Sequence, residues 1–217
     1  MLAKETVAFL RKLEKNNDRD WFAANKDAYV AANDNVIAMA GELIGRIAKF
    51  DPAVGGLDPK NCVFRIYRDV RFSKDKSPYK TNMGAFIAPG GRKAMSPGYY
   101  FHIQPKMYFA AAGKHMPDAA ELLKIRKAVS RNFDAFKKIV EAKKFKNRFG
   151  ELHGEQLSRP PKGFVEDDPA IEYLKFKSFT TGEEFTEKKA LSDEYLIMLA
   201  ESFKASYPLV EFLREAL

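Results

Sequence analysis

The middle of the chain most constrains what it can fold into. Four short segments there alternate polar and apolar positions and are rich in β-branched and aromatic side chains, which is typical of strands. Gly90-Gly91 and Gln104-Pro105-Lys106 are turn signals between them. Neighbouring strands joined by short connections form an antiparallel meander. The segments that we expect to be strands are residues 63–68, 83–88, 99–104 and 107–112.

Apolar residues return to helical spacing on both sides of these strands. Residues 3–15 predict one helix, and Asp18 has the type and position of an N-cap for a second, long helix that ends near residue 49. Pro208 is expected to interrupt the last helix, because proline lacks the N–H that a helix interior needs. The helices expected after the sheet cover residues 118–143, 168–174 and 191–207.

The chain is therefore predicted to be α+β. We expect an antiparallel sheet of about four to six strands, one of them within residues 176–185, flanked by N-terminal and C-terminal helices. No repeat, low-complexity tract or linker divides the sequence, which predicts a single domain over residues 1–217. Helices are expected at 3–49, mainly strands at 61–113, and mainly helices again at 117–217.

Positive charge is concentrated in two blocks. Residues 60–80 hold seven Lys and Arg and two Asp, and residues 124–148 hold ten Lys and Arg and two acids. The blocks carry +5 and +8, which leaves −5 of the total of +8 for the rest of the chain. Such blocks attract phosphates, nucleic acid or acidic partners. The second block lies on a helix whose other face is apolar, so a solvated helix face is favoured there over a nucleic-acid surface.

The first block is the main candidate site. In a strand over residues 63–68, Arg68 would share a face with Phe64 and would need a partner, which Asp69 could supply. Arg68 and Arg71 could form a fork for a phosphate or carboxylate, with lysines adding charge and tyrosines stacking on the ligand. The predicted ligand-binding residues are Arg65, Tyr67, Arg68, Arg71, Lys74, Lys76 and Lys80.

Two other interpretations stay open. The motif could be a structural salt-bridge network in a non-catalytic protein-interaction module, or both basic blocks could serve a nucleic-acid-associated protein. Whether the protein is an enzyme is left open. If it is, Asp69, His102 and Tyr79 are the candidates for proton transfer. His102 would share one face of its strand with Tyr100 and Gln104, a row that could line a cleft, although an ordinary half-exposed strand surface is favoured for it.

The sequence lacks the motifs of several common binding and catalytic sites. No zinc, calcium, nucleotide-loop or serine-elbow pattern is present, so no metal is predicted and no cofactor is identified. The single cysteine, Cys62, reads as a small buried hydrophobe. No apolar stretch resembles a signal peptide or membrane span, and we expect a cytoplasmic protein with no membrane partner. The ligand, the oligomeric state and the pathway stay undetermined.

The motif also resembles a known family. The string from Arg65 to Lys80, RxxRDxRFSKDKxPYK, looks like the signature of a family of bacterial and fungal conserved hypothetical proteins of unknown function. One departure is the stretch Ala110–His115, where a Lys and a His stand before Met116. The resemblance implies one domain and brings no established activity. Further similar fragments are Asn16–Phe22, Gly98–His102, Pro161–Phe164 and Leu174–Phe179.

Overall fold

The computed structural model describes residues 1–217 and confirms the α+β class. The chain forms two compact units and passes between them after Met95, within three strands and within the last helix. Whether the whole chain is one domain stays a prediction. The first unit comprises Met1–Met95, Tyr100–Ala110 and Glu184–Glu201, and the second comprises Ser96–Tyr99, Ala111–Glu183 and Ser202–Leu217.

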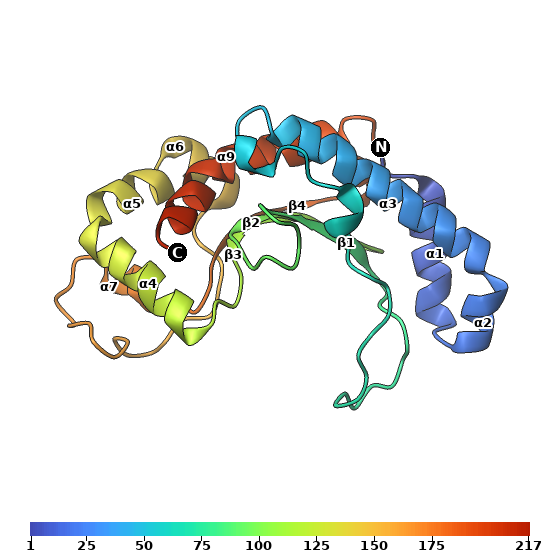
Figure 1. The fold of residues 1–217 in the computed structure, drawn as a ribbon, viewed down its shortest axis with the longest axis horizontal. Helices are drawn as coiled ribbons and strands as arrows, with labels where there is room; N and C mark the ends of the chain where they lie inside the picture. The colour runs from blue at the N-terminus through green and yellow to red at the C-terminus, as the bar shows by residue number, and fades with distance from the viewer. The chain divides into compact units, whose positions relative to one another are not determined.

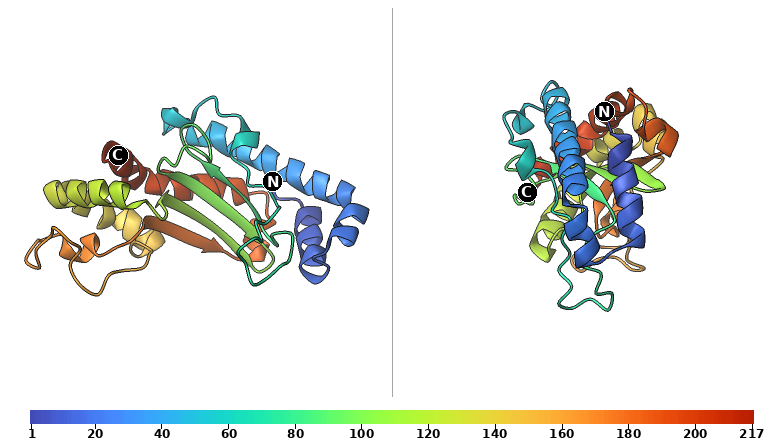
Figure 2. Two further views of the ribbon diagram at one scale, coloured as in Figure 1. Left: turned by 60° about the horizontal axis from the view of Figure 1, so that its bottom comes forward. Right: turned by 90° about the vertical axis from the view of Figure 1, so that its right-hand side faces the viewer.

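Four strands form one antiparallel sheet, as the sequence predicts, and they lie in the order β1-β2-β3-β4 (Figure 2). Side chains of β2 alternate: Phe101 and Ile103 are fully buried, whereas Tyr100 and Gln104 stay half-buried. This period-2 pattern places one apolar face toward helices and leaves a more polar face. The strands are β1 (Met83–Ile87), β2 (Gly98–Gln104), β3 (Met107–Lys114) and β4 (Phe179–Phe185).

Helices of the first unit pack on its apolar core. α3 (Lys26–Ile47) contacts β1 and also α1 (Lys4–Lys15), as Figure 1 shows. Asp18 is the N-cap of α2 (Arg19–Ala24), accepting a 2.8 Å hydrogen bond from the Trp21 N–H, as expected. The remaining short helices are the 3-10 turns Pro52–Val54 and Pro59–Asn61 and the helix α8 (Glu187–Ala190).

Helices of the second unit enclose a second core, which includes Phe136, Phe145 and Phe179. Asp168 accepts hydrogen bonds from the Ala170 N–H at 2.8 Å and the Ser130 hydroxyl at 2.6 Å. The helices are α4 (Ala119–Arg131), α5 (Phe133–Val140), α6 (Lys143–Phe149), α7 (Ile171–Leu174) and α9 (Tyr195–Glu215), of which α9 begins in the first unit.

Three details differ from the sequence predictions. Residues 63–68 form only isolated antiparallel bridges, at Val63 and Tyr67, rather than a strand. The two long predicted helices break at Asn25 and Asn132, residues whose side chains compete for backbone hydrogen bonds. Pro208 does not interrupt α9, since the helix runs through it. No helix is long and apolar enough to cross a membrane.

Candidate functional site

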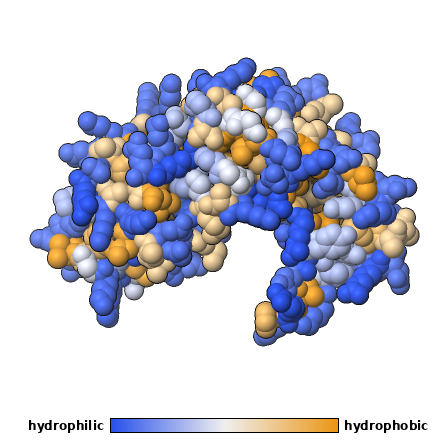
Figure 3. All heavy atoms as spheres, viewed as in Figure 1, coloured by the Kyte–Doolittle hydropathy of each residue, from blue (hydrophilic) through white to orange (hydrophobic).

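The basic motif forms a hairpin-like loop that extends away from β1 and α3, seen in teal in Figures 1 and 2. Its base is antiparallel: Tyr67 bridges Tyr79, the Arg68 N–H donates to Pro78 O at 3.0 Å, and the Lys80 N–H donates to Ile66 O at 2.8 Å. Figure 3 shows mostly hydrophilic colours over this loop. The backbone therefore fixes which residues lie at the base and which at the tip.

Arginines at the tip are paired within the loop. The guanidinium of Arg71 forms a bidentate pair with Asp69, at 2.9 and 2.6 Å, which holds the pKa of that carboxyl below its usual range. Arg68 pairs with Asp75, not with the adjacent Asp69. Hydrogen bonds from Ser77, and then the Arg68 pair, lower the pKa of Asp75. The charges of the predicted fork are thus largely neutralised.

The rest of the tip is exposed. Lys76 donates from Nζ to the Val70 carbonyl at 3.1 Å, and Lys74 is exposed. Phe72 is 96% exposed, with the Arg71 guanidinium 5.8 Å from its ring centroid. None of these contacts gathers free cations around a hollow, so the tip offers no enclosed anion site.

Three cations near the loop base have no carboxylate partner. They are Arg65, Lys80 and Arg92, which we call the base cluster, and none of them forms an ion pair. Burial, and then the charges of Arg65 and Arg92, lower the pKa of Lys80. The Lys80 Nζ lies 5.5 Å from the centroid of the Phe64 ring, and Arg92 donates to the carbonyls of Lys60 and Asn61. Positive charge converges here with no carboxylate at ion-pair distance, although Arg65 also helps to lower the pKa of Asp69.

A polar row on β2 begins at a residue that contacts Phe64. The Tyr100 ring meets the Phe64 ring edge-on at 6.0 Å between centroids. Tyr100 Oη is 2.8 Å from Nδ1 of His102, whose Nε2 is 3.1 Å from Oε1 of Gln104. The imidazole also stacks on Phe109 at 4.6 Å and is only 8% exposed. We call Tyr100, His102 and Gln104 the polar row.

Burial sets the protonation of the polar row. It lowers the pKa of His102, against a smaller opposite effect of the Gln104 hydrogen bond, and raises the pKa of Tyr100 to about 12. Both side chains are therefore neutral near neutral pH. Gly84 leaves space for this arrangement, because a Cβ there would lie 2.9 Å from Tyr100 Oη and 2.4 Å from Phe101 O.

One comparison with known proteins identifies the family. The family described as conserved hypothetical protein (DUF2461) matches residues 5–212, nearly the whole chain. The chain belongs to this family. The resemblance seen in the sequence is thereby confirmed. No curated protein and no solved structure matches the chain.

In this DUF2461 member, the predicted proton-transfer residues have separate sets of partners. Asp69 is paired with Arg71 at the tip, and His102 belongs to the polar row. Tyr79 is buried and stacks on Phe22 at 3.9 Å, with its pKa raised by burial. The structure connects His102 with Tyr100 instead. No group of three or more His, Cys, Asp or Glu side chains is placed to hold a metal ion.

Several residues of the site escaped the sequence interpretation. Phe64 was considered only as a strand residue, and Arg92 was not among the predicted ligand-binding residues. Asn17 holds the loop base from a distance in sequence: its amide donates to Tyr79 O at 2.9 Å and its Oδ1 accepts from the Tyr79 N–H at 3.1 Å. The basic motif indicated Arg65 and Lys80 of the base cluster, and the Tyr-x-His-x-Gln spacing indicated that the three side chains of the polar row share one face of a strand.

Proposed function

We propose that the protein binds a small anionic ligand, phosphorylated or carboxylated, at the base cluster of Arg65, Lys80 and Arg92. The observation that supports this most is the convergence of these three cations, none of them in an ion pair, with one of them a half-buried lysine whose charge is disfavoured by its surroundings. A bound anion would offset both the desolvation and the mutual repulsion. Phe64 and Tyr67, both partly exposed, would supply contacts to an organic part of the ligand.

The proposal keeps part of the sequence prediction and shifts its centre. Arg65 and Lys80 remain ligand-binding residues, Arg92 joins them, and Arg68 and Arg71 organise the tip through their own carboxylates. A role for Tyr67, Lys74 and Lys76 in contacting a larger ligand stays a prediction. We also expect the protein to be cytoplasmic.

Replacing Lys80 by Met tests the anion site. Inorganic phosphate and a dicarboxylate would be titrated into both proteins by calorimetry. Loss of one charge-assisted contact is expected to weaken binding by about 10-fold or more, since such bonds contribute about 1.5–3 kcal/mol. Binding to the wild type should survive moderate salt, because a partly buried pair is screened less than surface charges.

Arg71→Ala is the matched control. It also removes one cation from the motif, but one that Asp69 already neutralises. We expect a change of under about 2-fold in affinity, within the small worth of an exposed pair. Equal losses of affinity in Lys80→Met and Arg71→Ala would indicate that the anion binds at the tip of the loop. If neither anion binds the wild type, the alternative of a structural motif in a non-catalytic interaction module is supported instead.

A second candidate function rests on the other basic block. Seven exposed cations on α4 to α6 form no ion pair, and only Asp134 and Glu141 among residues 124–148 oppose them. Among residues 124–148 no large hydrophobic side chain is exposed, which disfavours insertion into a lipid surface. A phosphate polymer such as double-stranded DNA is the better match. The cations are Lys127, Arg131, Lys137, Lys138, Lys143, Lys144 and Lys146.

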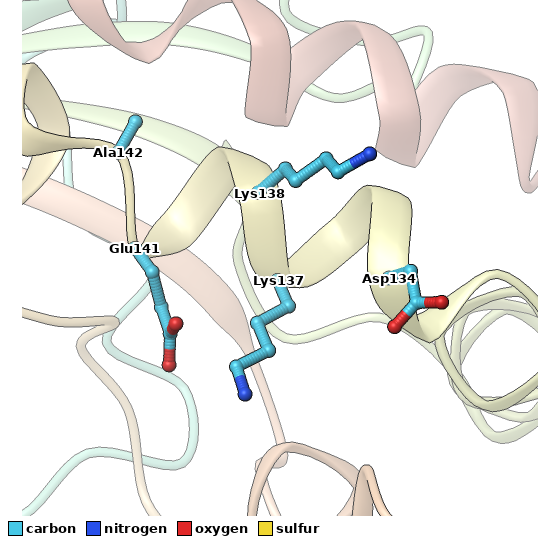
Figure 4. Close-up of a pocket in the computed structure, with 5 residues that line it drawn as sticks. All are labelled: Asp134, Lys137, Lys138, Glu141 and Ala142. Carbon is cyan, nitrogen blue, oxygen red and sulfur yellow. The ribbon is translucent and has the colours of Figure 1, made fainter.

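A pocket on α5 does not itself explain this block. Figure 4 shows its lining, in which Lys137 and Glu141 extend to the same side of the helix. The lining also includes Lys138 and Asp134, so its formal charges cancel. An anion preference would therefore come from the wider surface and not from this pocket.

The salt dependence of DNA binding tests the second candidate. We expect a Lys-to-Gln variant at positions 137, 138, 143 and 144 to reduce the slope of log K against log salt by about 3–4, at about 0.9 per lost phosphate contact. Fluorescence anisotropy with a short duplex at several salt concentrations measures it. Lys80→Met should leave the slope unchanged. Absence of binding even at low salt would reject this function.

A further inference from the structure

The tip of the basic loop is a turn that presents one aromatic ring to solvent. The Ser73 N–H donates to Val70 O at 3.3 Å, which places Arg71 and Phe72 at the two central positions of a β-turn. Lys76 Nζ donates to the same carbonyl at 3.1 Å. These bonds hold the turn and leave the ring of Phe72 almost fully exposed. The turn therefore carries an isolated apolar group at the end of a hydrophilic loop, where Figure 3 also shows apolar colour.

Charge at the tip is positive, although its two arginines are paired. Each of them is balanced by an aspartate of the loop, whereas Lys74 and Lys76 form no ion pair. Lys74 is two residues from Phe72, so their Cα atoms are at most about 7 Å apart. Lys76 is held at the turn by its hydrogen bond to the Val70 carbonyl. Two lysines without a carboxylate partner therefore share a short segment with the exposed ring, on an open surface.

A ligand that uses this whole surface needs a flat apolar group with negative charges close to it. An inorganic anion has no group for the ring of Phe72, and the tip has no hollow that would enclose such an anion. Unpaired nucleotides supply both parts in every unit, because each base has a π-face for stacking and each phosphate carries a charge. The tip therefore matches a single strand of nucleic acid.

A lipid surface and a nucleic-acid duplex match the tip less well. Binding in a lipid interface increases with the apolar area that is buried, and Phe72 is the one large hydrophobic side chain exposed among residues 68–80. Its chain neighbours Arg71 and Ser73 are polar and would have to enter the interface with it. A duplex would have to be unstacked at one step before the ring could insert, a cost that a single strand does not have.

We propose that the tip of the basic loop binds single-stranded nucleic acid, with Phe72 stacked on an unpaired base and Lys74 and Lys76 in contact with adjacent phosphates. The Arg71 guanidinium, held by Asp69, lies over the Phe72 ring at 5.8 Å from its centroid, so the base would stack on the opposite face. This function goes beyond anion binding at the base cluster. It requires neither that cluster nor the cations of α4 to α6.

A short oligothymidylate and an abasic oligonucleotide of equal length form the matched pair of probes, because they carry the same phosphates but only the first has bases. We expect the wild type to bind oligothymidylate about 10-fold more tightly, the contribution of one stacked base. In Phe72→Ala this preference should fall below about 2-fold, whereas Phe72→Tyr should keep it. Val165→Ala also removes an exposed apolar side chain, beside Glu166 and Asp167, and should leave the preference unchanged. Fluorescence anisotropy of the labelled oligonucleotides measures the affinities.

Lys74→Gln separates the contribution of charge from that of the ring. It should weaken binding of both oligonucleotides to a similar extent and reduce the slope of log K against log salt by about 0.7, the value for one phosphate contact on a single strand. Phe72→Ala should leave that slope unchanged, because the ring carries no charge. Titrations at several salt concentrations measure both slopes.

Phe72→Trp provides a local readout that does not depend on a loss of affinity. Stacking of a base should quench the tryptophan fluorescence of this variant but not that of the wild type, whose single tryptophan, Trp21, lies in α2. Equal affinity of the wild type for the two oligonucleotides, or no quenching of the variant, would overturn the inference and leave the anion site at the base cluster untouched. A blue shift with phosphatidylglycerol vesicles and no response to oligothymidylate would replace it with a lipid-binding tip.

Discussion

Gly113→Ala is expected to lower the free energy of unfolding by about 4 kcal/mol, by combining backbone strain with overpacking. Gly113 has a φ of +118°, outside the range that residues with a Cβ readily adopt. An added Cβ would lie 2.1 Å from the carbonyl oxygen of Phe179 on the neighbouring strand β4. Backbone on both sides leaves neither group free to move. Denaturant unfolding measures the change.

Gly150→Ala separates the two causes. Gly150 also has a positive φ, +71°, but nothing lies within 4 Å of its Cβ position. The variant should therefore lose only about 1–2 kcal/mol, the cost of the left-handed conformation alone. If both variants lose the same amount, contact between β3 and β4 at Gly113 is not what restricts the position.

Asn17→Ala is expected to lower the free energy of unfolding by about 2 kcal/mol, since two hydrogen bonds of about 1 kcal/mol each disappear. The Asn17 side-chain amide donates to the carbonyl of Tyr79 and accepts from its N–H, the same two hydrogen bonds that a neighbouring strand would make. Without it, the buried Tyr79 backbone loses partners and the base beside Lys80 loosens. The proposed anion site should then lose affinity too. Chemical unfolding and phosphate titration measure the two effects.

Asn16→Ala is the matched control for this prediction. Its amide donates only to Lys12 O within the end of α1, at an exposed position. We expect a loss of under about 1 kcal/mol and unchanged phosphate binding, because an exposed hydrogen bond is readily replaced by water. An effect as large as that of Asn17→Ala would mean that the end of α1, and not the contact with Tyr79, supports the loop.

Local patterns predicted most elements, and the exceptions have physical reasons. Alternation identified β1, β2 and β3, and helical spacing identified α1 and most of α9. Pro208 does not end α9, because the residues after it, Leu209, Val210 and Leu213, are fully buried and stabilise the continued helix. Burial of that apolar surface outweighs one missing backbone hydrogen bond.

The candidate site was predicted only in part. The density of Arg and Lys in residues 65–80 singled out the segment that holds Arg65 and Lys80, whose role in binding stays a prediction. The spacing of Tyr100, His102 and Gln104 predicted that these side chains share one face of β2, where they form a hydrogen-bonded row. The partners in the ion pairs could not be predicted from the sequence. Arg68 has Asp69 beside it in the chain yet pairs with Asp75, seven residues away. The turn of the loop, and not sequence adjacency, decides which carboxylate reaches which guanidinium.

The sequence by itself determined the α+β class, the family, the segmental charge and the identity of the basic motif. Each of these depends on local periodicity or composition, which neighbouring residues specify. Tertiary structure decided which cations stay uncompensated, because that depends on distances between segments such as Lys80 and Arg92. It also brought Phe64 into contact with Lys80 and Tyr100. Coulomb energy and hydrogen bonding act through space, so only the folded chain sets them.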